Sequence, residues 1–408
     1  MKNFSIFIGK TIQKVSRLRG GGSALPGLVI EKLDPDFGRE VLSQLPFGVV
    51  LISGTNGKTT TTKIVTELLE DQGLKVFTNK TGSNFFRGVI SEILSDIKLT
   101  GAFDYDIAVL ELDEAHAVKF IEKVPVDYTL LLNAQRDQLD RFGEVDHVVD
   151  LLQKVAKKTK KAVILNREDS RIRNIEAKNT IYFGLEKSLL KKIPSEDRIN
   201  SELAESQIPA AVILEKISEK SATFRVEDKS FTCDLRLKGI YNAFNAAGAV
   251  ALCHTILPKI NIDNFFTSLE KIESAFGRGE VVNINGTRAE LFLVKNPSAF
   301  QISLESFADD RHDYMIAIND NVADGRDVSW LWDVDFSKLD NVCVVSGVRA
   351  ADMALRLKYD NIKTEYIEAD LVSALKKFTQ DSTKEKRIFA TYTAMLEIRK
   401  IVSGRSIN

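Results

Sequence analysis

The chain has 408 residues, 44% of them hydrophobic and 28% charged, a globular composition with enough material for roughly two or three domains. Its 56 basic and 57 acidic side chains leave a formal net charge of −1, so we expect no nucleic-acid partner. Its three scattered cysteines exclude a disulfide framework and a structural zinc site, and no apolar stretch is long enough for a bilayer span or a signal-peptide core, so we expect a cytoplasmic protein.

The first 45 residues are expected to form a basic helical segment. Before the first carboxylate, Glu31, the chain carries five basic side chains and no acid. Apolar residues fall on one side of a helical wheel and basic residues on the other, the pattern of a basic amphipathic helix. We expect this helix to dock on its own domain through the apolar side; the alternative is weak attraction to an anionic membrane surface. The apolar side comprises Phe4, Ile8, Ile12, Val15 and Leu18.

Short β-branched runs alternate with amphipathic helices from residue 46 onward, which predicts an α/β domain over 46–275 with a parallel sheet covered by helices. Within it, residues 185–237 begin with a polar stretch and then show strand-like alternation without helices, so we expect an antiparallel insertion there. A helix at 242–256 returns to the main domain. The strands of the parallel sheet are expected at 49–53, 76–78, 107–112, 128–133, 162–166 and 181–183.

A second, smaller α/β unit of Rossmann-like type is expected over 276–408. The glycine-flanked segment Gly277-Arg278-Gly279 predicts the hinge that leads into it. Buried-looking apolar runs predict the strands of its sheet. These runs lie at 290–294, 314–318, 342–346, 364–367 and 387–390.

The strongest local signal is the segment 53–60, with the sequence Ser-Gly-Thr-Asn-Gly-Lys-Thr-Thr, between a predicted strand and a predicted helix. Glycines let backbone N–H groups turn toward a polyphosphate, and a helix N-terminus adds its positive dipole end. Lys58 can neutralise the outer phosphates, and Thr59 can offer a hydroxyl to Mg²⁺. We therefore predict an ATP site that consists of Gly54, Thr55, Asn56, Gly57, Lys58, Thr59 and Thr60.

A carboxylate at the end of a neighbouring strand is the usual ligand of a metal that accompanies a triphosphate. Glu111 is the one acid in the apolar strand at 107–112, so we predict that Glu111 and Thr59 hold Mg²⁺. Asp113 and Glu114, just beyond this strand, are either supporting groups or part of a solvated loop. A third polar cluster, at 136–144, follows the strand at 128–133, and the ends of parallel strands face one crevice.

Together these three elements resemble the Mur ligase family, ATP-dependent enzymes that activate a carboxylate as an acyl phosphate for attack by an amine. The segment 239–247 resembles the part of the family's central domain in which the first asparagine, here Asn242, contacts the nucleotide base. Gly277-Arg278 matches the family's arginine, here Arg278, that reaches the phosphates from the domain junction. Motifs between 294 and 350, above all Asp-Gly-Arg-Asp-Val-Ser-Trp at 324–330, resemble the MurT branch, the Mur-ligase-like subunits of lipid II isoglutaminyl synthase.

The resemblance implies that the chain amidates the α-carboxylate of D-glutamate in the lipid II stem peptide, giving D-isoglutamine, at the cytoplasmic face of the membrane. It implies ATP and Mg²⁺ as cofactors, Lys58 and Glu111 as catalytic residues, and a GatD-type glutaminase subunit as the partner that supplies ammonia. Cys343 lies in an apolar strand, so we expect an inert thiol and a glutaminase on another chain. In the family the aspartate that matches Asp327 faces the glutaminase and is proposed to complete its Cys-His pair; alternatively, Asp327 caps the turn that begins at Val328.

Three departures from the wider family affect these expectations. Gln138 stands where other Mur ligases have a metal-binding histidine, and Phe292 stands where amino-acid-adding members have an aspartate. The four-cysteine zinc ribbon of many MurT sequences is absent, since segment 185–237 contains only Cys233. Two alternatives of different class remain: a stand-alone amino-acid ligase of Mur or folylpolyglutamate type, and a catalytically idle nucleotide-binding scaffold.

Overall fold

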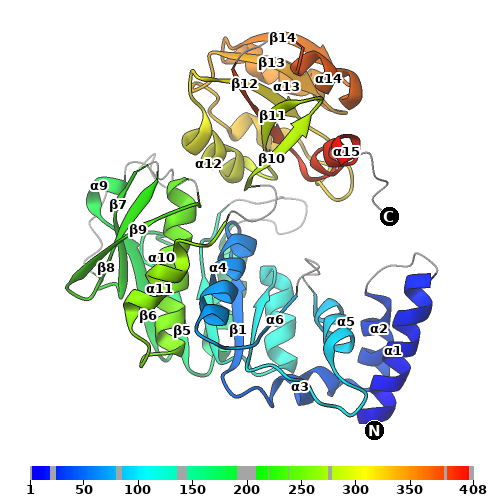
Figure 1. The fold of residues 1–408 in the computed structure, drawn as a ribbon, viewed down its shortest axis with the longest axis vertical. Helices are drawn as coiled ribbons and strands as arrows, with labels where there is room; N and C mark the ends of the chain where they lie inside the picture. The colour runs from blue at the N-terminus through cyan, green and yellow to red at the C-terminus, as the bar shows by residue number, and fades with distance from the viewer. Residues whose placement is uncertain are drawn as a thin grey trace.

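The computed structural model of the chain contains two sheets, each covered by helices, within the residues that it describes (Figure 1). None of the helices in this part of the chain combines the length and the apolar character needed to cross a membrane. The structure describes residues 2–18, 24–79, 85–135, 145–190, 208–218, 220–237, 239–273, 278–380 and 384–403.

The larger sheet has nine strands in the described part of the chain, in the order β2-β3-β1-β4-β5-β6-β7-β8-β9. Neighbouring strands from β2 to β7 are parallel, and β7, β8 and β9 are joined by antiparallel pairing. The strands are β1 (Gly48–Ser53), β2 (Val76–Thr78), β3 (Ile107–Glu111), β4 (Tyr128–Leu131), β5 (Ala162–Asn166), β6 (Thr180–Leu185), β7 (Val212–Ile217), β8 (Ser221–Val226) and β9 (Lys229–Asp234).

Both faces of the central strands are buried, because their apolar residues alternate between two cores. Val50 and Ile52 of β1 face one core, and Val49 and Leu51 face the other. The first core is closed by α4 (Lys58–Asp71), α10 (Ile240–Ile256) and α11 (Ile262–Leu269). The opposite face is covered by α5 (Phe86–Asp96), α6 (Glu114–Lys123) and α8 (Val145–Lys158). This double cover explains why the central strands are apolar throughout, as in other parallel sheets.

The segment that we expected to form an antiparallel insertion does contain antiparallel strands, β7–β9, but they extend the main sheet. Strand β7 pairs in parallel with β6, and only β8 and β9 turn back along it. The inward-facing residues Phe224 and Cys233 join the same core as α10, which is why this edge does not form a separate layer. Residues 191–207, the polar stretch before it, lie outside the described residues, apart from the short helix α9 (Lys187–Leu190) that precedes them.

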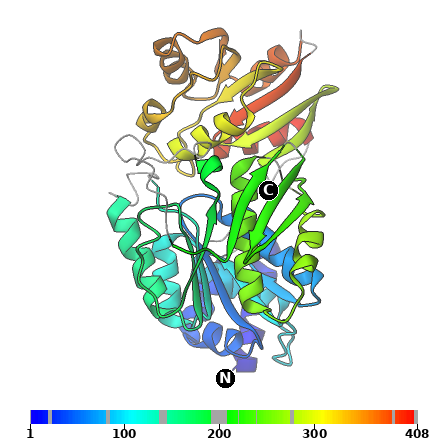
Figure 2. The same cartoon turned by 90° about the vertical axis from the view of Figure 1, so that its left-hand side faces the viewer.

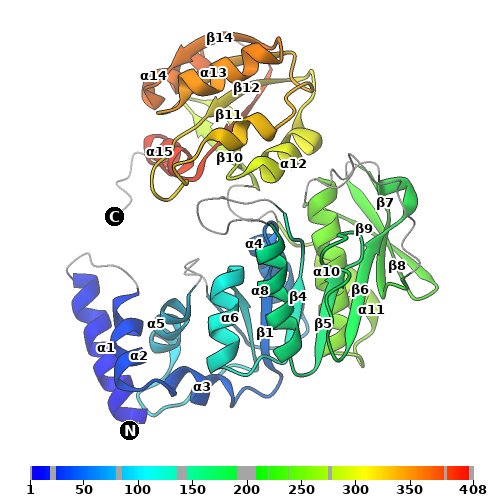
Figure 3. The ribbon, with the colours of Figure 1, turned by 180° about the vertical axis from the view of Figure 1, so that it is seen from behind.

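The first helix, α1 (Lys2–Leu18), docks on its own chain as predicted, but through a face that overlaps the predicted apolar side only in part, at Ile8. Ile6 and Gly9 are buried against α2 (Leu25–Leu33) and α5, whereas Phe4 is 69% exposed and Val15 is 43% exposed. A Cβ at Gly9 would lie 2.5 Å from Leu94 of α5, so this small residue sets the close approach of the two helices. A third short helix, α3 (Phe37–Leu42), leads into the sheet. Figure 3 shows these helices beside α5, at the end of the molecule away from β7–β9.

The smaller sheet has six strands in the described part of the chain, in the order β10-β11-β15-β12-β13-β14. All neighbouring pairs are parallel except β10 and β11, which form a hairpin that the sequence reasoning missed. Its elements are β10 (Arg278–Ile284), β11 (Thr287–Leu293), α12 (Pro297–Phe307), β12 (His312–Ala317), the 3₁₀ helix η2 (Ser329–Asp333), β13 (Asn341–Ser346), α13 (Ala350–Tyr359), β14 (Lys363–Glu368), α14 (Leu371–Phe378), β15 (Glu385–Ala390) and α15 (Tyr392–Ser403).

The smaller unit lies over the carboxyl end of the larger sheet (Figures 1 and 2). This is the end at which β1 stops and α4 begins, so the loop between them faces the smaller unit. The geometry follows from the parallel strands, whose carboxyl ends lie at one edge. The domain boundaries at 45 and 275 remain predictions.

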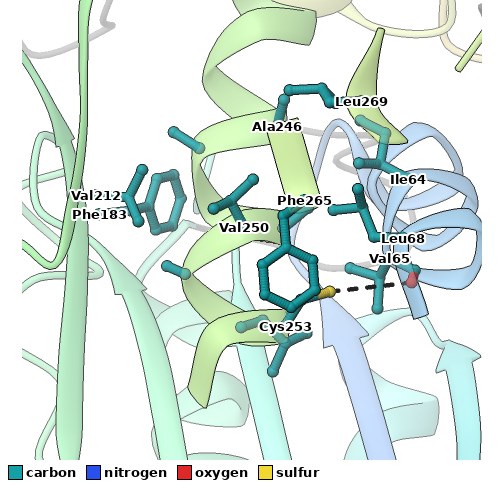
Figure 4. Close-up of a cluster of buried hydrophobic side chains, with 14 of the residues drawn as sticks. Ile64, Val65, Leu68, Phe183, Val212, Ala246, Val250, Cys253, Phe265 and Leu269 are labelled. Carbon is teal, nitrogen blue, oxygen red and sulfur yellow. Dashed lines mark hydrogen bonds between the residues drawn. The ribbon is translucent and has the colours of Figure 1, made fainter. Parts of the chain in front are cut away.

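The packing of the core behind α4 can be tested by a substitution at Phe265 of α11. Its ring is fully buried among α4 and α10 residues, close to Val65 and Cys253 (Figure 4). We expect Phe265→Ala to lower the free energy of unfolding of the larger unit by about 3–5 kcal/mol, because it removes a buried ring and leaves a cavity. Urea unfolding followed by far-UV circular dichroism measures this loss.

The matched control is Phe7→Ala, because the Phe7 side chain is 62% exposed. We expect this change to shift stability by less than about 0.5 kcal/mol. Both tryptophans, Trp330 and Trp332, lie in the smaller unit, so tryptophan fluorescence follows that unit separately. An unchanged circular dichroism midpoint in Phe265→Ala would contradict the described packing.

Candidate functional site

The loop between β1 and α4 has the backbone geometry that the sequence predicted for it. Gly54 has φ +127° and Gly57 has φ +90°, values that side chains with a Cβ rarely adopt. A Cβ at Gly54 would lie 2.8 Å from the carbonyl oxygen of Asn133, and one at Gly57 would lie 2.9 Å from the amide of Asn245. Both glycines are therefore required by close approach as well as by conformation. Helix α4 then begins with Lys58 and four consecutive threonines, Thr59–Thr62.

The end of strand β4 holds this loop in place through two polar residues that the sequence reasoning did not select. The amide N–H of Asn56 donates to Asn133 Oδ1 at 2.8 Å, and Asn133 Nδ2 donates to the Asn56 carbonyl at 2.9 Å. The Gln135 N–H donates to Thr55 Oγ1 at 3.0 Å, and Asn56 Nδ2 donates to Gln135 Oε1 at 2.9 Å. Their place just after a strand that neighbours β1 is the signal that could have identified them.

Lys58 is buried and folds back over the loop. Its Nζ donates to the carbonyl oxygen of Gly54 at 2.6 Å and to that of Thr55 at 3.3 Å. Asp113 Oδ1 lies 3.1 Å from the same Nζ, so Asp113 acts as the counter-ion of Lys58 in this structure. Of the two interpretations of Asp113, the supporting group therefore fits this structure better than the solvated loop.

Thr59 and Glu111 meet at the first turn of α4, as the metal prediction requires. Thr59 Oγ1 donates to Glu111 Oε1 at 2.9 Å. Asn79 fixes the backbone of Glu111 from the neighbouring strand, because its amide accepts from the Glu111 N–H at 3.0 Å and donates to the Glu111 carbonyl at 2.8 Å. A hydroxyl and a carboxylate oxygen side by side are ligands of the kind that Mg²⁺ prefers. No group of three or more His, Cys, Asp or Glu side chains suited to a metal occurs among the residues the structure describes.

Thr60 adds a further polar group at the same place. Its hydroxyl is buried and has no hydrogen-bond partner among the described residues. Buried hydroxyls are nearly always satisfied by protein, water or a ligand. The hydroxyls of Thr62 and Thr66 on the same helix also have no partner there, so the fit to an oxyanion ligand rests on the glycine turn and Lys58.

A cleft between the two units opens beside the loop. Asn242, in the first turn of α10, is buried and lines it. The larger unit also contributes Asn56, Gly57, Asn133, Gln135, Gly239, Tyr241 and Asn245. The wall from the smaller unit consists of Phe292, Leu293, Ala299, Ile302, Ser303, Ser306 and Phe307. The rings of Phe292 and Phe307 contact each other with centroids 4.3 Å apart, so the position at which related ligases have an aspartate is aromatic here.

The smaller unit also touches the loop directly, through two consecutive residues after β11. Lys295 Nζ donates to the carbonyl oxygen of Thr55 at 3.3 Å, and Asn296 Nδ2 donates to Asn56 Oδ1 at 3.4 Å. Asn296 also caps α12, since its Oδ1 accepts from the Ala299 N–H at 2.7 Å. Neither residue is among the site residues selected from the sequence.

Two predicted site elements cannot be placed. Residues 136–144, which include Gln138, lie outside the described residues. Gly277 lies outside them too, and Arg278 is described only as the first residue of β10, with no account of its side chain. The predicted hinge thus leads into the edge strand of the smaller sheet. The role of Arg278 stays a prediction.

Asp327 lies away from the loop, on the surface of the smaller unit. It is exposed, and its Oδ1 accepts from the Ser329 N–H at 2.8 Å, which stabilises the start of η2. The local turn that we weighed as an alternative is therefore present, and the exposure leaves the carboxylate accessible to a partner. Asp324 anchors the same segment, because its buried carboxylate accepts from the Thr393 N–H at 2.8 Å and from the Asn321 N–H at 3.2 Å.

Comparison with known families decides the relationship. Residues 52–253 match the model of the Mur ligase middle domain, and residues 293–395 match the model of the MurT ligase C-terminal region. The chain belongs to the MurT branch of the Mur ligases. A curated relative, "Lipid II isoglutaminyl synthase (glutamine-hydrolyzing) subunit MurT" of Streptococcus pneumoniae, is 28% identical over 96% of this chain and 95% of its own length.

Solved structures share the fold. The pseudomurein peptide ligase type C of Methanothermus fervidus aligns with a TM-score of 0.68 and 17% identity, over 87% of this chain and 78% of its own. The MurF ligase of Thermotoga maritima in complex with ADP aligns with a TM-score of 0.65 and 19% identity, over 91% and 83%. The predicted fold class, a Mur ligase-type α/β domain with a second α/β unit, is confirmed.

The three cysteine thiols have raised pKa values, whereas the nucleophilic thiol of a glutaminase must form a thiolate readily. Burial raises the pKa of Cys343 to about 11 and that of Cys233 to about 12, and it raises the pKa of the fully buried Cys253 as well. A thiol is protonated below its pKa, so raising the pKa removes thiolate at neutral and mildly alkaline pH. These thiols are therefore poor nucleophiles.

We expect the native chain to react with iodoacetamide at pH 8 at least about a hundredfold more slowly than the same chain in urea, because the native thiolate fractions are lower and access is restricted. Mass spectrometry of tryptic peptides reports each cysteine separately. The urea-unfolded chain is the control for the intrinsic reactivity of each peptide. Rapid labelling of native Cys343 would contradict the inert assignment.

Proposed function

We propose that this chain is the ligase subunit of a lipid II isoglutaminyl synthase, which amidates the α-carboxylate of the D-glutamate in the lipid II stem peptide to D-isoglutamine. The observation that carries the proposal is the glycine loop, which is followed by Lys58 and Thr59 beside Glu111 and which lines a cleft between the two units through Asn56 and Gly57. The relationship to the MurT subunit of Streptococcus pneumoniae over nearly the whole chain supports this choice of reaction.

A carboxylate is a poor electrophile, so the reaction requires its conversion to an acyl phosphate at the expense of ATP. In the proposed site the N–H groups of Gly57 and of the first turn of α4 bind the phosphates, since those of Thr55 and Asn56 already donate to Asn133, and Lys58 neutralises the charge that shifts during transfer. Thr59 and Glu111 would hold Mg²⁺, which supplies charge neutralisation between the phosphates when bound. Ammonia then attacks the acyl carbon and phosphate leaves.

The cleft offers a place for the nucleotide base. Asn242 presents a buried amide there, next to Tyr241 and opposite the Phe292 and Phe307 rings. Aromatic rings and an amide are suited to hold a purine by stacking and hydrogen bonding. We assign Asn242 to the base and Arg278 to the phosphates, as the family resemblance implies. A MurF ligase of this fold was solved with ADP, which supports a nucleotide in this cleft.

The ammonia must come from another polypeptide, because the thiols of this chain are poor nucleophiles. We assign this role to a GatD-type glutamine amidotransferase subunit, which fits the "glutamine-hydrolyzing" subunit name of the relative. The exposed Asp327 is proposed to orient the histidine of that partner, since a carboxylate can complete a Cys-His pair across an interface. The substrate would place the complex at the cytoplasmic face of the membrane.

The reaction itself is tested by purifying the chain with and without a co-encoded glutaminase. ATP, Mg²⁺, glutamine and lipid II are supplied, and mass spectrometry detects the conversion of the carboxyl group to an amide. Incorporation of a supplied amino acid by the chain alone, with no amidation in any mixture, would favour a stand-alone amino-acid ligase. Nucleotide binding without any product would favour the idle scaffold.

Lys58→Ala and Glu111→Ala should each lower the amidation rate about a hundredfold or more, because both remove charge stabilisation of phosphoryl transfer. The rate is measured with lipid II, ATP and ammonium, and circular dichroism checks that the variants are folded. Lys63→Ala, five residues along the same helix, is the matched control, since Lys63 is part-exposed and pairs with Glu67. Wild-type turnover in either site variant would refute this phosphate site.

Asp327→Asn should impair the glutamine-dependent reaction far more than the ammonium-dependent one. Asparagine keeps the size and can still accept from the Ser329 N–H, but it loses the charge that stabilises a protonated histidine. Both rates are measured in the reconstituted complex after confirming that the subunits associate. Asp333→Asn, an exposed aspartate of the adjacent η2 helix, serves as control. An equal fall in the glutamine-dependent and ammonium-dependent rates would indicate that Asp327 has a structural role instead.

A further inference from the structure

Two lysines from different units converge on one backbone oxygen of the glycine loop. Lys58 Nζ lies 3.3 Å from the carbonyl oxygen of Thr55, and Lys295 Nζ lies 3.3 Å from the same atom. The two Nζ atoms are therefore separated by no more than the sum of these two distances. Lys58 comes from the start of α4, whereas Lys295 comes from the smaller unit, directly after β11.

Two ammonium groups this close to each other raise the local positive potential, which favours an anion near them. Asp113 offsets the charge of Lys58, at 3.1 Å, so Lys295 is the cation that the smaller unit adds. Thr55, on which both lysines converge, belongs to the glycine loop that fits an oxyanion. The convergence of these cations on the loop therefore points toward an anionic ligand.

The backbone on either side of Lys295 is fixed, so its placement is not an accident of a loose loop. The Val294 N–H donates to the Ala390 carbonyl at 2.9 Å, which extends the pairing of β11 with β15. On the other side, Asn296 caps α12 and reaches Asn56 of the loop. Lys295 is thus held between a strand ladder and a helix cap, with its side chain directed at the loop.

We infer that Lys295 is a phosphate-binding residue that the smaller unit supplies to the polyphosphate in the glycine loop. When the polyphosphate is bound, Lys295 exchanges the Thr55 carbonyl for a phosphate oxygen, and the smaller unit is drawn to the larger one through this contact. The inference rests on the proposed nucleotide site and adds a residue to it. It also makes the bound phosphates part of the interface between the two units.

The test is equilibrium binding of the non-hydrolysable ATP analogue AMP-PNP with Mg²⁺ to the full chain by calorimetry. We expect Lys295→Met to weaken binding about tenfold or more, the usual effect of losing one charge-assisted hydrogen bond. Lys295→Arg should restore most of the affinity, because it keeps the charge. Adenosine, which has no phosphate, should bind wild type and Lys295→Met equally.

The control is Lys384→Met. Lys384 is exposed, lies in the same unit and also donates to a backbone carbonyl, that of Asp310 at 2.9 Å, so its loss should leave AMP-PNP affinity unchanged. If Lys295→Met does not fold, as judged by circular dichroism, Lys295→Gln takes its place with the same expectation.

The outcomes separate this inference from the proposed function. Failure of the wild-type chain to bind AMP-PNP would refute the nucleotide site itself. If wild type binds, Lys58→Met weakens binding and Lys295→Met binds as tightly as wild type, the role of Lys295 is overturned while the nucleotide site stands. Equal weakening of adenosine and AMP-PNP by Lys295→Met would show that Lys295 acts on the shape of the cleft, which also overturns the inference.

Discussion

The glycine loop depends on hydrogen bonds that come from outside it. Thr55 and Asn56 are bonded to Asn133 and Gln135 at the end of β4, and the smaller unit reaches the same two residues. A loop with two glycines at positive φ has little conformational preference of its own. The external bonds fix it in one shape, so the parallel sheet and the position of the smaller unit together determine whether the proposed phosphate site exists.

Much of the fold could be predicted because the central strands are apolar on both faces and are separated by helices of clear periodicity. The strands at 76–78 and 162–166 match the structure residue for residue, and the helix expected at 242–256 begins two residues earlier. The predictions failed where burial depends on the tertiary partner. The sequence could not indicate that Gly9 and Ile6 would dock α1, because that face is chosen by α2 and α5.

The same distinction applies to the candidate site. Lys58, Thr59 and Glu111 could be selected because their spacing relative to a strand and a helix carries the chemistry, and the structure brings them together. Other contacts join residues that are far apart in the sequence. The amides of Asn133 and Asn79 bond to the backbone of the loop and of strand β3, and the ammonium of Lys295 bonds to a loop carbonyl. The sequence indicates only that each of these residues follows a strand, so the contacts themselves become visible from the arrangement of the strand ends in space.

The composition of α4 has a consequence for how the proposed site forms. Four successive β-branched threonines follow Lys58, and β-branched residues are weak helix formers. The first turns of α4 therefore gain their order from what lies behind them, the apolar contacts of Ile64, Val65 and Leu68 with α10 and α11. A peptide cut from this region would not be helical in water, and its amide groups would not point at a common centre. Assembly of the anion pocket is thus an event of tertiary folding, and it cannot precede closure of the core on that side of the sheet.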